Sequence, residues 1–190
     1  MNQNDILELF RRTGALLHGH FLLRSGLHSR EFFQCALLLR DTKVAEQVCG
    51  ALADKLRGVD FDTVISPALG GLLVGQEVAR QLGKPHIFAE KDDQGALVLR
   101  RGFEITPGER FVVVEDVVTR GGRVMETVEI VKKHGGAVAA AACLVNRSGG
   151  QLPAMDFPFT GLVEMTPETF APDALPADLA GIPAVKPGSK

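Results

Sequence analysis

Apolar residues along this chain follow two regular patterns that alternate. Short apolar runs, typical of parallel strands buried on both faces, occupy residues 63–66, 86–89, 110–114 and 137–145. Segments between these runs carry apolar residues at three- and four-residue spacing, as on one face of a helix. The alternation predicts an α/β fold class, with a Rossmann-like parallel sheet and helices on both of its faces.

The expected helices have recognisable ends. Asp41 or Thr42 is a suitable cap for a helix that ends near Gly58, and a later helix over residues 72–82 is expected to end at Gly83. A first helix is expected to be capped by Asn4 and to pack as a lid. Its apolar positions are Ile6, Leu9, Phe10 and Leu17.

The most informative stretch runs from residue 110 to residue 136, which reads as a strand, a loop and a helix. Val124, Val128 and Val131 recur at helical spacing, and Gly135 can adopt the left-handed conformation that ends a helix. The loop therefore lies at the carboxyl end of a strand and the amino end of a helix. In open α/β sheets this is where ligands bind.

The residues of this loop favour a sugar phosphate. Gly121 and Gly122 let the backbone approach an anion closely, and Thr119 offers a hydroxyl. Glu115 and Asp116 would repel a phosphate, so we expect them to meet ribose hydroxyls or a Mg²⁺ ion carried by another phosphate.

Composition excludes several other classes of protein. The 190 residues suit one domain, and a formal net charge of −2 is not that of a chain built to neutralise nucleic acid. No stretch is apolar enough to span a membrane, and the first twelve residues lack the order of a signal peptide, so a cytoplasmic location is expected. Cys35, Cys49 and Cys143 are read as buried free thiols.

Two common nucleotide motifs, G-x-x-x-x-G-K-[ST] and G-x-G-x-x-G, do not occur. The string VVVEDVVTRGG instead resembles the signature of type I phosphoribosyltransferases, which bind 5-phosphoribosyl 1-diphosphate (PRPP). The resemblance implies the type I phosphoribosyltransferase fold, with the acidic pair on the ribose hydroxyls and the following loop on the 5-phosphate. The PRPP-binding residues that it implies here are Glu115, Asp116, Val117, Val118, Thr119, Arg120, Gly121, Gly122 and Arg123.

The amino-terminal segment FLLRSGLHSREFF reads as a hairpin with a polar connection. It resembles the F-x-L-x-S-G-x-x-S-x-x-[FY] segment with which orotate phosphoribosyltransferases bind the base. The resemblance places Arg24, Phe32, Phe33 and Thr119 at orotate. A guanidinium suits a carboxylate and a phenyl face covers a flat ring, although strand residues that simply face the core and the lid would leave the same pattern.

A second junction of strand, glycines and helix follows residue 66. If the sheet is parallel, Gly70 and Gly71 lie near the Thr119 loop and can offer N–H groups to a pyrophosphate. The resemblance likewise implies a pyrophosphate loop at Ser66 to Gly71, with Ala68, Leu69 and Gly70 at PRPP, although many orotate enzymes carry a lysine at the Gly70 position. Without the resemblance, a packing turn explains the segment equally well.

A charged hairpin is expected over residues 86–102. Related orotate enzymes carry a mobile catalytic loop here that reaches into the neighbouring subunit. Of its basic residues only Lys91 has a counterpart in this chain, and it is the expected catalytic cation beside Glu115 and Asp116. Arg100 and Arg101 are alternative sources of that charge.

The carboxyl-terminal part contributes one further basic residue. Arg147 follows the strand over residues 137–145 and matches an arginine that contacts the base in orotate enzymes. One domain is expected over residues 1–190. Its parts are a hood and base-binding segment at 1–40, a core at 41–150, and at 151–190 a final strand (residues 159–165) with a proline-rich, extended or partly disordered tail that completes the hood.

The resemblance implies Mg-dependent transfer of phosphoribosyl from PRPP to orotate, giving orotidine 5′-monophosphate and pyrophosphate in pyrimidine biosynthesis. Mg²⁺ is the expected cofactor, held mainly by PRPP, and no protein group is assigned to it directly. A homodimer with shared active sites is expected from the family alone, with no nucleic acid or membrane as partner. A phosphoribosyltransferase for a purine, or a PRPP-binding regulator without turnover, remains as an alternative.

Overall fold

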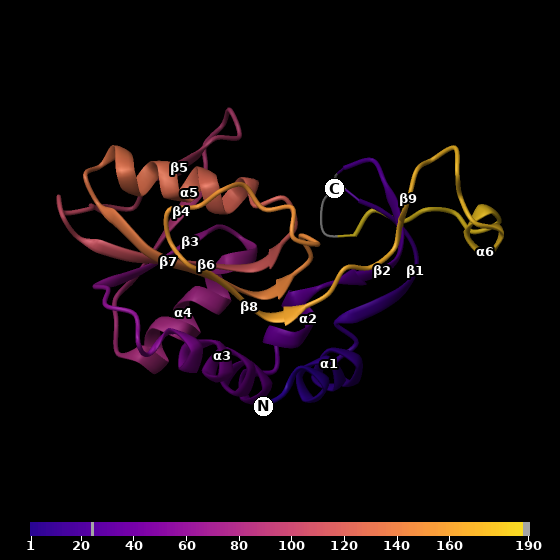
Figure 1. The fold of residues 1–190 in the computed structure, drawn as a ribbon, viewed down its shortest axis with the longest axis horizontal. Coiled ribbons are helices and arrows are strands. Elements are labelled where there is room, and N and C mark those ends of the chain that lie inside the picture. The colour runs from indigo at the N-terminus through magenta and orange to yellow at the C-terminus, as the bar shows by residue number, and fades with distance from the viewer. Residues whose placement is uncertain (24, 188–190) are drawn as a thin grey trace.

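The computed structural model describes residues 1–23 and 25–187, and it is built around a six-stranded sheet (Figure 1). Its strands are β3 (Thr63–Pro67), β4 (His86–Lys91), β5 (Leu97–Leu99), β6 (Arg110–Val118), β7 (Ala137–Asn146) and β8 (Phe159–Glu164). Their order is β5-β4-β3-β6-β7-β8, and every neighbouring pair is parallel except β4 with β5. The expected α/β class is confirmed, and β4 and β5 form the expected hairpin.

Helices cover both faces of this sheet because its central strand is apolar on both. Val112 and Val114 of β6 pack toward α3 (Thr42–Leu56) and α4 (Gly70–Leu82), whereas Phe111 and Val113 pack toward α5 (Gly122–Lys133). Side chains alternate across a strand, so one apolar run supplies both halves of the core. All four side chains are fully buried, and each such burial contributes about 1.5–3 kcal/mol.

A smaller sheet lies beside the main one in Figure 1. It joins β1 (Leu16–Leu22), β2 (His28–Phe33) and β9 (Thr169–Phe170) in antiparallel order, so the amino-terminal hairpin is confirmed. Three short helices complete the fold. Helix α1 (Gln3–Arg12) packs on β1 and β8, α2 (Cys35–Leu39) packs against α3 and α4, and α6 (Ala177–Ala180) follows β9.

Most expected helix ends are confirmed, with three corrections. Asp41 caps α3, and Gly83 and Gly135 are left-handed. The cap of α1 is Asn2, not Asn4, because Asn2 forms a reciprocal capping box with Asp5. Leu17 belongs to β1 rather than to α1, which ends at Arg12, and α4 begins at Gly70, two residues before the expected start.

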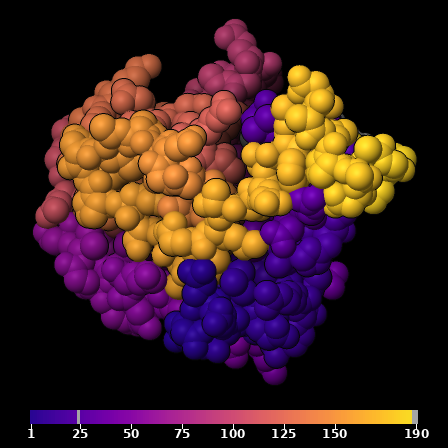
Figure 2. Space-filling view, turned by 45° about the vertical axis from the view of Figure 1, so that its right-hand side comes forward, coloured from indigo at the N-terminus to yellow at the C-terminus, as the bar shows by residue number. Residues whose placement is uncertain are grey.

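The carboxyl-terminal tail is more ordered than expected. Val185 donates its N–H to the His20 carbonyl and accepts from the N–H of Leu22, which adds a short strand-like pairing to the amino-terminal hairpin. Arg30 binds Asp178 through two hydrogen bonds and Glu168 through a third. Figure 2 shows the yellow carboxyl-terminal residues packed against the violet amino-terminal ones. Of the two predicted alternatives, an extended or a partly disordered tail, the described part follows the extended one, with contacts to the amino-terminal hairpin.

His20 holds this tail most directly. Its side chain is 5% exposed, and its ring nitrogens lie 2.6 Å from the Ile182 carbonyl and 2.6 Å from Nδ1 of His28.

A membrane-spanning helix is absent from the described residues, since none of their helices combines the length and the apolar character that crossing a bilayer needs.

Replacing His20 with leucine is expected to loosen the tail. The change leaves the Ile182 carbonyl and His28 without their buried partner, which costs about 1–3 kcal/mol of unfolding free energy. Thermal unfolding and limited proteolysis near residue 182 measure the effect. His134→Leu is the control, since exposed His134 bonds only to a carbonyl of its own helix. Equal behaviour of the two variants would contradict the role given to His20.

Candidate active site

The acidic pair lies inside β6 and not in the loop after it, because β6 continues to Val118. Glu115 is 7% exposed and Asp116 is half-buried. The first turn of α4 passes directly over both. A Cβ added to Gly70 would lie 2.6 Å from Oδ1 of Asp116, and one added to Gly71 would lie 3.2 Å from Oε1 of Glu115. At Gly71 the added Cβ would also lie 2.9 Å from the Val114 carbonyl oxygen, so the backbone requires glycine there, whereas at Gly70 it would meet only the carboxylate end of the Asp116 side chain.

This contact places the start of α4 at the carboxyl edge of the sheet. The first N–H groups of a helix have no partner within it, and the helix dipole makes this end favourable for anions. The structure thus sets Gly70 and Gly71 beside the acidic pair, as the parallel topology predicted. Sequence reasoning proposed the two glycines as anion donors and did not foresee their contact with the carboxylates.

A second helix start lies on the other side of the pair. Gly121 has a φ of 75° and precedes α5, so a left-handed residue turns the chain from β6 into the helix. Thr119 and Arg120 are exposed in this turn, and Arg123 lies in the first turn of α5, where it pairs with Glu126. The loop predicted for a 5-phosphate therefore has free backbone and side-chain donors at a helix start.

Burial raises the pKa of Glu115 well above its usual range, and the neighbouring Asp116 charge raises it further. Both effects disfavour two ionised carboxylates at one site in the free protein. A ligand that brings hydroxyl donors or a cation would relieve them. The pair is thus suited to a polyhydroxyl ligand or to a ligand that carries a metal.

Arg147 approaches the same edge from the end of β7. Its N–H donates to the Val118 carbonyl at 2.7 Å, and its guanidinium carbon lies 6.0 Å from the centre of the Phe33 ring. Burial lowers the pKa of Arg147, and its buried Nε has no hydrogen-bond partner among the described residues. A buried donor without a partner is costly, and an anionic ligand could accept a hydrogen bond from Nε.

The two adjacent phenylalanines of β2 face opposite sides. Phe33 is buried and meets Phe10 edge to face at 5.1 Å, so it belongs to the core beneath Arg147. Phe32 is half-buried and packs on Phe21 at 5.8 Å. Of the two, only Phe32 keeps an open face. The Arg24 prediction lies outside the described residues.

The three candidate cations of the β4–β5 hairpin differ in how far they are already paired. Arg101 donates to Glu90 at 2.8 Å and lies 5.8 Å from the Phe88 ring, so it is already held. Lys91 ends β4 and is exposed, and so is Arg100. Asp92 closes the tip by accepting from the N–H groups of Gln94 and Ala96. The hairpin is compact, as its sequence predicted.

Among the described residues, no group of three or more His, Cys, Asp or Glu side chains is arranged to hold a metal ion. Glu115 and Asp116 nevertheless present carboxylate oxygens, which suit Mg²⁺ when a ligand supplies its remaining oxygens. The two carboxylates are therefore compatible with a Mg²⁺ ion that is held mainly by a bound ligand.

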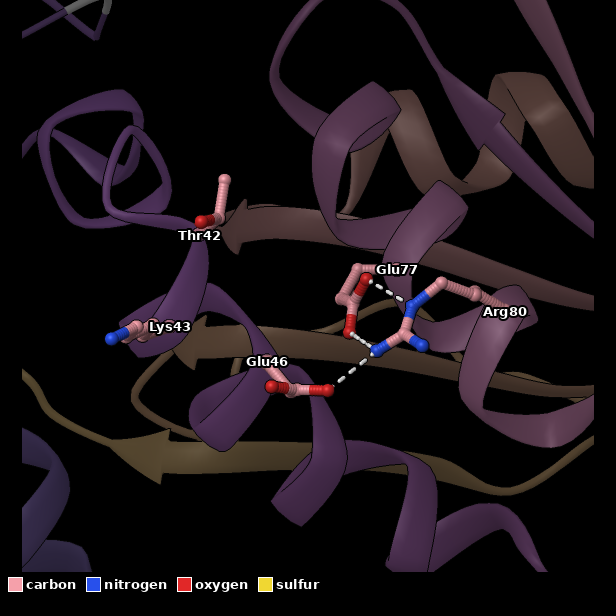
Figure 3. A pocket seen from close by; sticks show the side chains of 5 residues that line it. All are labelled: Thr42, Lys43, Glu46, Glu77 and Arg80. Atoms are coloured by element: carbon pink, nitrogen blue, oxygen red, sulfur yellow. Dashed lines mark hydrogen bonds and ion pairs between the residues drawn. The ribbon is translucent and has the colours of Figure 1, made fainter.

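A surface groove between α3 and α4 has different chemistry (Figure 3). Arg80 binds Glu46 and Glu77 there, and its hydrogen bond lowers the pKa of Glu77. The charges satisfy one another, so we assign the groove to helix packing.

Glu115→Gln is expected to stabilise the free protein at neutral and alkaline pH. A carboxyl whose pKa is raised by folding stabilises the native state at low pH, and this contribution is lost as pH rises through the folded-state value. The amide cannot ionise, so the variant should gain on the order of 1 kcal/mol at high pH and show a flatter pH dependence. Unfolding in denaturant from pH 5 to pH 9 measures both, with Glu126→Gln on the surface as the control. A variant that is less stable than the parent at pH 9 would contradict the argument.

Comparisons with known proteins identify the family of this chain. Residues 38–168 match the Phosphoribosyl transferase domain family. The orotate phosphoribosyltransferase of Caldicellulosiruptor bescii is 47% identical, with 100% of this chain and 99% of the relative covered. That of Methylorubrum extorquens is 48% identical over 100% of this chain and 97% of its own.

Solved structures agree on the fold. The orotate phosphoribosyltransferase of Aeropyrum pernix superposes with a TM-score of 0.72 at 25% identity, covering 84% of this chain and 93% of its own. The adenine phosphoribosyltransferase of Thermoanaerobacter pseudethanolicus, at 21% identity, a TM-score of 0.63, and 71% and 88% coverage, shares the fold alone. The chain belongs to the orotate phosphoribosyltransferases of the phosphoribosyl transferase domain family.

Proposed function

We propose that this chain is a glycosyltransferase that moves the phosphoribosyl group of PRPP to orotate, with Mg²⁺, giving orotidine 5′-monophosphate and pyrophosphate for pyrimidine biosynthesis. The observation that carries the proposal is the acidic pair at the end of β6, flanked by the starts of α4 and α5. Two anion-binding ends around two carboxylates match a ligand with a phosphate, a pyrophosphate and sugar hydroxyls between them.

In this proposal each end of PRPP meets a different helix. The 5-phosphate binds the N–H groups and hydroxyl of the Thr119 loop, and the pyrophosphate binds the loop from Ala68 and the first turn of α4, at Gly70 and Gly71. Glu115 and Asp116 accept from the ribose hydroxyls between them. Such contacts replace the lost hydration of the buried Glu115 carboxyl.

The chemistry needs no protein nucleophile. A ring nitrogen of orotate bonds to the anomeric carbon as the carbon–oxygen bond to pyrophosphate breaks. Pyrophosphate leaves with the electron pair, and the proton of the ring nitrogen passes to water or to the departing pyrophosphate. Positive charge grows on the ribose and negative charge on the leaving group, so donors placed at the pyrophosphate lower the barrier. When bound, Mg²⁺ supplies charge neutralisation of the pyrophosphate oxygens. Lys91 adds a mobile cation from the hairpin, and the carboxylates fix the ribose.

Orotate is an anion with a flat ring, and both properties have counterparts near β7. Arg147 offers a half-buried guanidinium whose buried Nε lacks a hydrogen-bond partner in the described chain, and Phe32 offers an aromatic face. Phe33 supports Arg147 from below. Arg24 keeps its proposed contact with the orotate carboxylate from the sequence argument.

A single assay tests the function. The protein is incubated with PRPP, Mg²⁺ and a panel of bases, and loss of orotate absorbance is followed together with pyrophosphate release. Pyrophosphate release that occurs with orotate and with no other base of the panel supports the proposal. Release only with a purine, or PRPP binding without any release, would replace it with one of the two alternatives.

The proposal includes a cytoplasmic homodimer with shared active sites. Leu69 is 82% exposed and Leu73 is 55% exposed, and one helical turn separates them beside the proposed pyrophosphate loop. Large apolar side chains in such a position favour burial against a second copy. Light scattering of the protein and of a Leu73→Glu variant tests the dimer, which the added charge should weaken.

Lys91→Ala is expected to lower kcat by about 10- to 100-fold and to change PRPP affinity much less. The physical reason is that the exposed lysine meets the pyrophosphate mainly as negative charge grows there. Steady-state kinetics with PRPP binding by calorimetry separate the two effects. Lys43→Ala, an exposed lysine on α3, is the control. Unchanged turnover would remove Lys91 from the mechanism.

Arg147→Ala is expected to raise KM for orotate by about 10-fold or more, because it deletes a buried charge-assisted contact. KM for PRPP should change little. Arg57→Ala, which breaks a surface pair with Asp54, is the matched control. Equal losses for orotate and PRPP would assign Arg147 a structural role.

A further inference from the structure

A buried hydrogen bond lies directly behind the proposed pyrophosphate loop. Ser66, near the end of β3, is 0% exposed, and its Oγ lies 3.1 Å from Nε2 of His86 at the start of β4. The other ring nitrogen, Nδ1, lies 3.3 Å from Oε1 of Gln76 on α4. The three side chains connect β3, β4 and α4.

The helix is built to leave room for this bond. A Cβ added to Gly75 would lie 1.9 Å from Oγ of Ser66 and 2.6 Å from Nε2 of His86. Real side chains never come so close, so any residue larger than glycine would displace one partner. The bond between Ser66 and His86 thus requires glycine at position 75.

The first turn of α4 lies against both Ser66 and the acidic pair. A Cβ added to Gly71 would lie 3.2 Å from Cβ of Ser66 and 3.2 Å from Oε1 of Glu115. Gly71 therefore sits between Ser66 and Glu115. One residue beyond Pro67, the N–H of Ala68 donates to the Ala89 carbonyl at 2.7 Å, a second tie between the loop and β4.

The bond has a defined direction at neutral pH. Burial lowers the pKa of His86 to about 4, so its ring is uncharged there. With Nδ1–H donating to Gln76, Nε2 is free to accept the hydroxyl proton of Ser66. The Ser66 hydroxyl, both ring nitrogens of His86 and Oε1 of Gln76 then each have a hydrogen-bond partner.

We propose that His86 is a positioning residue, which acts through Ser66 to hold the loop from Pro67 to Gly71, and with it the first N–H groups of α4, at the depth that the leaving pyrophosphate requires. The inference rests on the proposed function, because it assigns the pyrophosphate to this loop. His86 itself contacts no substrate in this scheme. Its effect is specific to one end of PRPP.

Three variants test the bond by a double-mutant cycle. Ser66→Ala and His86→Leu each remove it, and each should raise KM for PRPP and the Kd of Mg-pyrophosphate about three- to tenfold, while KM for orotate stays within about twofold. The double variant should lose no more affinity for PRPP and pyrophosphate than the single variant with the larger loss, because both changes delete the same bond. His86→Gln, whose amide oxygen can still accept from Ser66, should restore values near those of the parent.

Gly75→Ala tests the same point from the helix side, with Gly50→Ala as its matched control. Both are helix glycines, but the Cβ added at Gly50 meets only the end of the flexible Gln81 side chain, at 2.8 Å. Gly75→Ala should weaken PRPP and pyrophosphate binding at least threefold. Gly50→Ala should leave both unchanged.

Two results would overturn the inference. One is a lower melting temperature for Ser66→Ala and His86→Leu with unchanged binding of PRPP and pyrophosphate, which would make the bond structural only. The other is strictly additive losses in the double variant. Pyrophosphate and PRPP binding need no turnover, so the outcome stays readable even if the parent protein fails to convert orotate, a failure that would instead remove the proposed function.

Discussion

The contact between the first turn of α4 and the two carboxylates of β6 determines the arrangement of the site. It exists because Gly70 and Gly71 carry no side chains, so the helix backbone can lie against Asp116 and Glu115. A helix start next to a buried acidic pair places donors for an anion beside acceptors for hydroxyls. A bulkier residue at Gly71, where an added Cβ would lie 2.9 Å from the Val114 carbonyl oxygen, would push the helix away from the sheet edge and separate the two kinds of group.

The free protein therefore holds polar groups that it does not itself satisfy. Burial raises the pKa of Glu115, while Arg147 keeps a buried Nε without a partner in the described chain. Each state is unfavourable alone, and the two groups occupy the ends of neighbouring strands β6 and β7. A ligand pair with hydroxyls for the carboxylates and a carboxylate for the guanidinium would satisfy both. Binding free energy then arises from unsatisfied groups that folding has already positioned.

The sequence predicted the parts of this site that depend on local pattern. The apolar runs, the left-handed Gly83 and Gly135, and the strand–loop–helix order around Glu115 follow from periodicity and turn chemistry. Strand alternation requires Phe32 and Phe33 to face opposite sides, but it does not say which of them faces the core. Contacts between distant segments, such as Val185 with His20, leave no local signal in a proline-rich tail.

One distant contact did leave a signal, in the glycines Gly71 and Gly75. Small residues four apart on a helix lie on one face and mark a close approach to a neighbour. Here the neighbour is Ser66, whose side chain meets the added Cβ positions of both glycines. The glycine spacing identifies the helix face, but the partner strand follows only from the parallel pairing of β3 with β4 and β6. The depth of α4 against the acidic pair is thus set by three elements together, and a change at His86, outside the loop itself, can alter the anion site without touching a substrate.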